Sequence, residues 1–178
     1  STTYILILAL ILIVVYKKYP NFLENKKISF FIKNSALIFS IITFIMYALY
    51  VSDSSLGNAL NNLLSNRLHN IYAYNQVYNI TLFGNNNLNI NLTLDTLYAY
   101  CLYIYGIAFF ILFIIAFRKL FKRLYEQKKP ILIIIMLCFM AYGLSEKLWL
   151  SIDYNIFIIL FSMLIYDTNN KKLNTQKE

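Results

Sequence analysis

The segment LLSNRLHN, Leu63 to Asn70, holds an arginine, Arg67, and the chain's only histidine, His69. A guanidinium group has the planar donor pattern that binds phosphate through two parallel hydrogen bonds. Arg67 is therefore a candidate clamp for an anionic substrate; the alternative is an interfacial arginine that contacts lipid phosphate or caps a neighbouring helix. His69 is a weaker candidate, because a lone histidine is more often a surface or packing residue than a base or a ligand.

Three carboxylates stand at the edges of apolar runs: Asp95, Glu146 and Asp153. An aspartate at such a place can cap the following helix, which is the favoured interpretation for Asp153 and one of two equal interpretations for Asp95. Glu146 lies beside Lys147 in a short turn between two apolar runs. Ionisable groups close to bilayer depth are costly, so a functional role is the first hypothesis for Glu146.

Composition indicates a membrane protein. Of the 178 residues 60% are hydrophobic and 13% are charged, with a mean hydropathy of +0.58, whereas about 25% of a soluble domain is charged. The net charge of +8 would be compatible with nucleic-acid binding. The basic residues, however, cluster in short segments beside apolar runs, as membrane topology signals do. No nucleic-acid partner is therefore expected. Cys101 and Cys138 lie in apolar runs without metal-ligand spacing and are interpreted as packing residues, and no metal site is expected.

The apolar runs predict an all-α fold, a polytopic membrane bundle of about five helices within a single membrane domain, 1–178. A membrane helix needs about 20 mostly apolar residues. The first run is short and has no basic residue before it, which makes it a poor signal peptide. We therefore expect the chain to be the C-terminal part of a longer protein. The expected spans are 3–16, 28–51, 97–117, 131–144 and 148–166.

The basic residues also predict which side of the membrane each connection faces. Segments 17–27 and 118–129 and the C-terminal tail hold most of the lysines and arginines, which places them inside the cell. Segment 52–96 and the turn near 145–147 then lie outside.

The external segment 52–96 is expected to contain structure of its own. Apolar residues recur at spacings of three and four, which predicts an amphipathic helix over about 55–74, lying along the outer membrane surface. Asp53, Ser54 or Ser55 could cap it. Arg67 would lie close to its apolar face, and a loop with Gly84 at a turn follows.

Several motifs, taken in order, resemble the C-terminal half of Wzy-type polysaccharide polymerases, the multi-spanning proteins of capsule and exopolysaccharide loci in low-GC Gram-positive bacteria. The motifs are LLSNRLHN, NITLFG, LDTLYAY, LYIYGIAFFILF and GLSEKLWLSIDYNIFII, and the resemblance covers about residues 55–166. It implies a multi-pass protein of the cell membrane with an extracellular active face. Its reaction would polymerise oligosaccharide repeat units carried on undecaprenyl diphosphate, without nucleotide sugar, cofactor or metal. The implied partners are the lipid-linked oligosaccharide, membrane lipids, and flippase and chain-length regulator proteins.

The resemblance also assigns roles to residues. Arg67 occupies the place of the family's arginine after the LLS element, Asp95 matches the acidic residue that opens the span after the large loop, and Glu146 matches a glutamate in a late external turn. Arg67, with His69, would bind the lipid diphosphate and stabilise the leaving group, and Asp95 or Glu146 would serve as the base. Asn66 stands where the family often has glycine, and His69 has no clear counterpart. The family often has asparagine at the position of Thr96.

Two other functions are compatible with the composition. A transporter or flippase for the same lipid-linked sugars would call for charged or broken helices near the bilayer midplane, and most of the apolar runs lack interior charges. A non-catalytic membrane partner would leave Arg67, Asp95 and Glu146 dispensable. Tyr72, Tyr74 and Tyr78 could stack on sugar rings, although an interfacial belt is the favoured interpretation.

Overall fold

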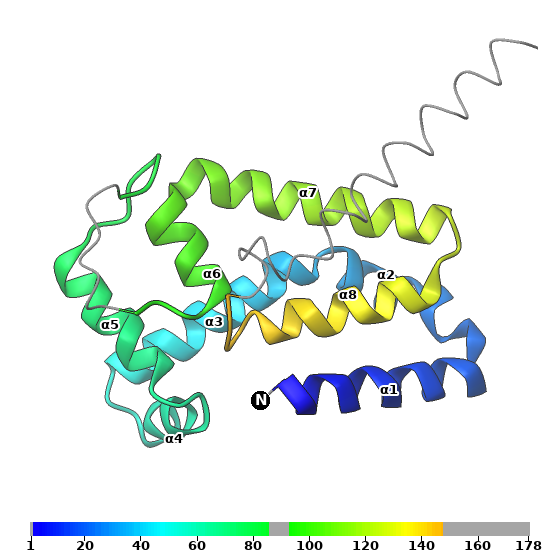
Figure 1. Cartoon of the computed structure of the whole chain (residues 1–178), viewed down its shortest axis with the longest axis horizontal. Helices are drawn as coiled ribbons and strands as arrows, with labels where there is room; N and C mark the ends of the chain where they lie inside the picture. The colour runs from blue at the N-terminus through cyan, green and yellow to red at the C-terminus, as the bar shows by residue number, and fades with distance from the viewer. Residues whose placement is uncertain (1, 86–92, 148–178) are drawn as a thin grey trace, which may run out of the picture. The chain divides into compact units, whose positions relative to one another are not determined.

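Helices are the regular elements of the part of the chain that the structure describes (Figure 1). The structure, a computed structural model, describes residues 2–85 and 93–147, all of which belong to one compact unit, 1–147. No strand occurs in these two ranges, which confirms the predicted all-α fold class; the expected span 148–166 and Asp153 lie outside them. The elements are α1 Thr2–Lys18, η1 Pro20–Glu24, α2 Lys26–Lys33, α3 Ser35–Val51, α4 Ser55–Leu63, α5 Arg67–Val77, α6 Leu97–Tyr100, the π-helical η2 Cys101–Tyr105, α7 Gly106–Glu126 and α8 Pro130–Tyr142.

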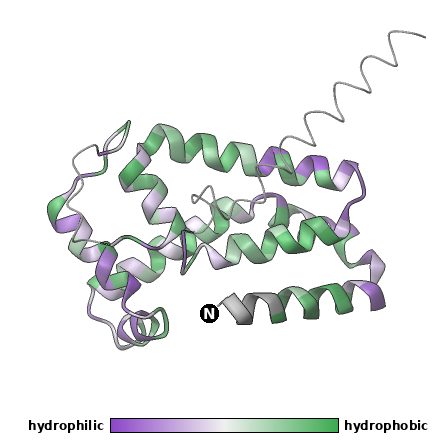
Figure 2. Ribbon diagram, in the orientation of Figure 1, coloured by the Kyte–Doolittle hydropathy of each residue, from purple (hydrophilic) through white to green (hydrophobic). Residues whose placement is uncertain are grey.

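One helical stretch of the described residues, Leu97–Glu126, is long and apolar enough to cross a membrane. Only 28% of its most apolar window is buried, whereas the core helix of a soluble protein would be mostly covered. Helices α2 and α3 would count as a second span if taken together, but they meet at 69°. Helix α8 is apolar (Figure 2) but shorter than a typical span. The described helices thus give one or two span candidates, and the five-span bundle remains a prediction.

The predicted helix over 55–74 is two helices, α4 and α5, separated by a tight turn. Ser54 caps α4, as one of the sequence alternatives proposed, by accepting a hydrogen bond from the amide of Gly57 at 3.0 Å. The helix then stops because Ser65 and Asn66 both adopt positive φ. Their amides bond back to the carbonyls of Asn62 and Asn61, the pattern of a Schellman C-cap.

The apolar run 97–117 is also interrupted, at Gly106, where φ is +85°. The amides of Ile107 and Ala108 cannot bond within a continuous helix, and they donate instead to the carbonyls of Thr81 and Leu82 at 3.1 Å. On the other side of the break, the amide of Asn85 donates to the Ile104 carbonyl at 3.3 Å. Segment 79–85 therefore closes both broken helix ends, and α6 and α7 run in different directions (Figure 1).

Two glycines make this insertion possible. Gly84 has φ +87°, and a Cβ atom there would overlap the carbonyl oxygen of Ile104. A Cβ atom on Gly106 would overlap the backbone of Gly84 and Leu82. The expected turn at Gly84 is present, and its role is to let two backbones touch.

Gly84→Ala is expected to destabilise the protein by more than about 2 kcal/mol, because it adds left-handed strain and a backbone overlap. Thermal unfolding of the purified chain in detergent measures the effect. Phe83→Ala is the matched control, since the side chain of Phe83 is 80% exposed and its loss should change the stability by less than about 0.5 kcal/mol. Equal unfolding temperatures for Gly84→Ala and the parent would show that segment 79–85 does not support the helix break.

Candidate functional site

Helix α5 carries Arg67 and His69, and protein packing fixes its position. Its apolar residues Leu68, Ile71 and Tyr74 are at most 1% exposed and pack with Ala99 and Tyr103 of α6 and η2. The prediction that this helix lies with its apolar face on the membrane is therefore wrong for α5, because protein covers that face. The close packing fixes the backbone from which the Arg67 side chain extends.

The turn before α5 is built around Asn61, a buried residue that the sequence analysis did not single out. Its side-chain nitrogen donates to the side-chain oxygen of Asn66 at 3.0 Å, and its side-chain oxygen accepts from the amide of His69 at 3.0 Å. Asn66 is the N-cap residue of α5 but makes no side-chain cap bond. Asn61 thus supplies the cap from the preceding helix and sets the direction in which α5 starts.

Arg67 forms an ion pair with Glu146, which lies 79 residues further along the chain. Nη2 of Arg67 donates to the carboxylate, while Nη1 donates to the carbonyl of Leu64 at 3.1 Å. The side chains are 17% and 25% exposed. Nε of Arg67 is buried and has no hydrogen-bond partner among the described residues. The guanidinium is therefore held on two sides, and its buried Nε–H is a donor that neither of these bonds uses.

The end of α8 brings Glu146 to this place. The amides of Ser145 and Glu146 bond to the Tyr142 carbonyl at 2.9 and 3.0 Å, which closes a turn after the helix. The amide of Leu97 then donates to the Gly143 carbonyl at 2.9 Å. Because this bond joins the start of α6 to the end of α8, the residues before Leu97 and after Gly143 lie close together.

Asp95 pairs with Lys147 rather than capping a helix. The distance from its carboxylate to Nζ of Lys147 is 3.8 Å, and Nζ also lies 4.7 Å from the centre of the Tyr100 ring. The N-cap position of α6 belongs to Thr96, which makes no side-chain cap bond. The capping interpretation of Asp95 is therefore wrong.

Arg67, Asp95, Glu146 and Lys147 together form what we call the charged cluster. Two ion pairs make it up, and they are joined because Glu146 and Lys147 are neighbours in the chain. Lys147 was not among the predicted site residues. One signal could have found it, since it is one of only three cationic side chains outside the basic segments.

His69 has other neighbours. Its Nδ1 lies 2.9 Å from the hydroxyl of Tyr50 on α3, and its ring packs edge-on against that of Tyr50. Residues two positions apart on a helix do not share a face, so the structure places His69 beside Tyr50 and not with Arg67 in the charged cluster.

The three tyrosines that could stack on sugar rings differ in their surroundings. Tyr74 is 1% exposed and packs against Tyr78 and Tyr103, so it offers no face to a sugar and belongs to no interfacial belt. Tyr72 is 38% exposed and packs edge-on against Tyr50. Burial, with repulsion from Tyr78 and Tyr100, raises the pKa of Tyr74 to about 12.

Within the described residues no group of three or more His, Cys, Asp or Glu side chains is placed to hold a metal ion. Both cysteines are buried and unpaired, as expected for packing residues. No protein-family model, curated protein or solved structure matches the chain. The charged cluster and the sequence motifs around it are therefore the features that bear on function.

A double-mutant cycle on Arg67→Gln and Glu146→Gln should give a coupling free energy above about 1 kcal/mol, because both partners are largely shielded from water. Lys122→Gln and Glu126→Gln form the matched control cycle. That pair is 3.9 Å apart and more than 60% exposed on both sides, and it should give less than about 0.5 kcal/mol. Thermal unfolding in detergent measures both cycles, and equal couplings would contradict the assigned geometry.

Tyr74 should make the protein sensitive to alkali. Its folded-state pKa lies above the unfolded value of about 10, so its contribution to stability is complete below pH 10 and is lost as the pH rises through about 12. Tyr74→Phe removes a buried hydroxyl that has no hydrogen-bond partner among the residues the structure describes, and it should lose this part of the pH dependence. The unfolding temperatures of Tyr74→Phe and of the parent protein are measured across this pH range. An equal dependence of unfolding temperature on pH in the two proteins would contradict the prediction.

Proposed function

We propose that the protein takes part in transferring oligosaccharide repeat units from an undecaprenyl diphosphate carrier onto a second lipid-linked unit, as a Wzy-type polymerase would. One observation carries the proposal: Arg67 and Glu146, far apart in sequence, are in contact, and Asp95 and Lys147 form the adjacent ion pair. The resemblance assigns roles to three of these four residues, Arg67, Asp95 and Glu146.

The membrane arrangement is part of this proposal. Five spans, with 52–96 and the turn near 145–147 outside, would place all four residues of the charged cluster on the outer side. Each of them lies in an external segment or at its border with a span. A lipid-linked substrate presents its diphosphate at headgroup height, where such a cluster could meet it.

The transfer reaction requires both positively charged and negatively charged side chains. A hydroxyl oxygen of the acceptor sugar attacks the anomeric carbon of the donor, and the bond from that carbon to the diphosphate oxygen breaks. Negative charge then develops on the lipid diphosphate, where Arg67 and Lys147 would stabilise it. The hydroxyl proton passes to a carboxylate, and both Glu146 and Asp95 are available for this role.

The ion pairs suggest how binding of the substrate would make a carboxylate available as the base. In the structure Glu146 pairs with the guanidinium of Arg67. A diphosphate carries more negative charge than a carboxylate and would compete for the same donors, together with the unused Nε. Its binding would release Glu146 from the ion pair, which makes a free carboxylate available only when donor is present.

A transporter remains the second candidate, because the helix break at Gly106 is the kind of feature such proteins use. In transporters the broken ends face the substrate. Here segment 79–85 occupies both ends with its own backbone groups, which favours the polymerase proposal.

The polymer ladder of a strain that lacks its own polymerase tests this proposal. The complete reading frame should restore the ladder, whereas Arg67→Ala and Glu146→Gln should each reduce it at least about 100-fold, the size expected from losing one catalytic electrostatic or proton-transfer contact. Membrane protein levels are checked by immunoblot.

Glu126→Gln is the matched control for Glu146→Gln, since it removes the same charge from an exposed ion pair on α7, and it should leave the ladder unchanged. A full ladder from Arg67→Ala would make this residue a structural anchor and would refute the site. Absence of a ladder from the unmodified reading frame would favour the transporter or the non-catalytic partner.

A further inference from the structure

A row of aromatic side chains leads away from the charged cluster. Nζ of Lys147 lies 4.7 Å from the centre of the Tyr100 ring, within the range of a cation–π contact. The centres of the Tyr100 and Tyr105 rings are 5.7 Å apart, and those of Tyr105 and Phe109 are 4.7 Å apart. We call Tyr100, Tyr105 and Phe109 the aromatic row. It connects a cation of the charged cluster to the first turns of α7.

A π-helical turn builds this row. In an α-helix two residues five positions apart point in different directions, because each residue turns the helix by about 100°. The π-helical η2, Cys101–Tyr105, has its hydrogen bonds between residues five apart, which brings Tyr105 next to Tyr100. Tyr105 is also the N-cap residue of α7, and Phe109 lies one turn further along that helix. Turns of this kind are frequent at functional sites, and this one aligns rings from two helices that run in different directions (Figure 1).

The row is partly exposed. Tyr105 and Phe109 are 38% and 37% exposed, and Tyr100 is half-buried against the core of α5 and α6. Leu112, three residues after Phe109 and therefore on the same side of α7, is 64% exposed. The rings thus have open faces, and an apolar surface continues from them along α7.

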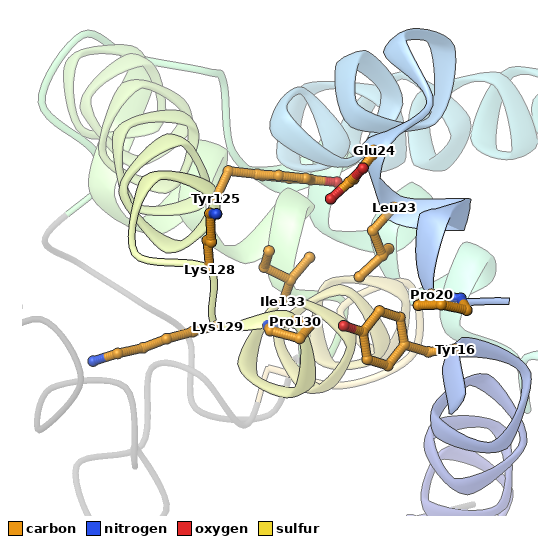
Figure 3. Close-up of a pocket in the computed structure, with 9 residues that line it drawn as sticks. All are labelled: Tyr16, Pro20, Leu23, Glu24, Tyr125, Lys128, Lys129, Pro130 and Ile133. Carbon is orange, nitrogen blue, oxygen red and sulfur yellow. The ribbon is translucent and has the colours of Figure 1, made fainter. Parts of the chain in front are cut away.

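Helix α7 gives the row a direction in the membrane arrangement proposed above. Its first half is apolar and its second half is basic (Figure 2). The connection after it carries Lys128 and Lys129, and the Lys129 side chain extends away from the small pocket beside η1 (Figure 3). Basic segments face the inside of the cell, so α7 begins at the outer side and Phe109 lies deeper than Tyr105. The row then runs from the charged cluster into the apolar layer.

We infer that the aromatic row binds the polyprenyl chain of the lipid-linked substrate, next to the diphosphate at the charged cluster. The inference rests on the proposed function and adds the part of the carrier that the protein recognises. The chain is joined directly to the diphosphate and has to pass from headgroup height into the bilayer, which is the path of the row. Its methyl branches recur in every isoprene unit, at a spacing comparable to that of the ring centres, and their hydrogens suit the electron-rich ring faces. A saturated acyl chain has no such branches.

Native mass spectrometry of the full chain in detergent tests the inference with two lipids that share a phosphomonoester head. They are undecaprenyl phosphate and phosphatidic acid with saturated acyl chains. The parent should retain undecaprenyl phosphate more tightly. Tyr105→Leu and Phe109→Leu should each weaken its retention about fivefold, the change expected from losing one aromatic contact, and should change that of phosphatidic acid less than twofold. The unfolding temperature of each variant in detergent shows that it is folded.

Phe30→Leu is the matched control, because it makes the same change at a ring on α2 that is 66% exposed; it should change the retention of either lipid less than twofold. Arg67→Gln acts on the shared head and should weaken both lipids equally. Equal retention of the two lipids by the parent, or equal effects of Phe109→Leu and Phe30→Leu, would overturn the inference and make the row an interfacial belt. That result would leave the proposed function standing, which the polymer ladder tests separately. If Arg67→Gln weakened neither lipid, the charged cluster would not be the phosphate site, and both the proposed function and the inference would fail.

Discussion

The hydrogen bond from the amide of Leu97 to the carbonyl of Gly143 is the contact on which the charged cluster depends. Gly143 is buried, and a Cβ atom there would lie 2.8 Å from a methyl carbon of Leu97, so the two backbones meet closely because no side chain intervenes. Asp95 precedes this contact and Glu146 follows it. A small residue at one backbone position thus brings together two carboxylates that are about fifty residues apart in the chain.

The charged cluster balances its charges internally. Arg67 with Glu146, and Lys147 with Asp95, leave no net charge, and the first pair is the more shielded of the two. Partly buried ion pairs gain little stability over an apolar replacement, because desolvation offsets the attraction. Their presence is easier to explain if the partners exchange: an anion that displaces Glu146 from Arg67 frees a carboxylate beside the bound charge. In the proposed reaction the Nε of Arg67, which has no hydrogen-bond partner among the described residues, would be a further donor to the diphosphate.

Backbone hydrogen bonding governs the rest of the fold near this cluster. The break at Gly106 would leave amides and carbonyls unpaired in an apolar environment, where each costs several kcal/mol. Segment 79–85 satisfies them, and its side chains Asn85 and Thr81 bond to the Tyr103 and Gly84 carbonyls at 2.8 and 2.7 Å. Asn85 thus acts as a partner for backbone groups, since its side chain also donates to the Asn79 carbonyl at 3.0 Å. Asn61 does the same for α5.

The sequence alone determined the helical class, a helix cap among Asp53, Ser54 and Ser55, and the glycine turn at position 84, and it singled out Arg67, Asp95 and Glu146. Periodicity, capping and isolated charge are local properties. It could not determine that the helix predicted over 55–74 ends at Leu63, since the left-handed turn that follows depends on bonds to Asn61 and Asn62. Nor could it predict that Lys147 pairs with Asp95 and Glu146 with Arg67. It also could not predict that His69 lies apart from them or that Tyr74 is buried. Ion-pair partners and burial depend on which helices meet, and here that follows from glycine contacts between segments distant in the chain, which only the tertiary structure decides.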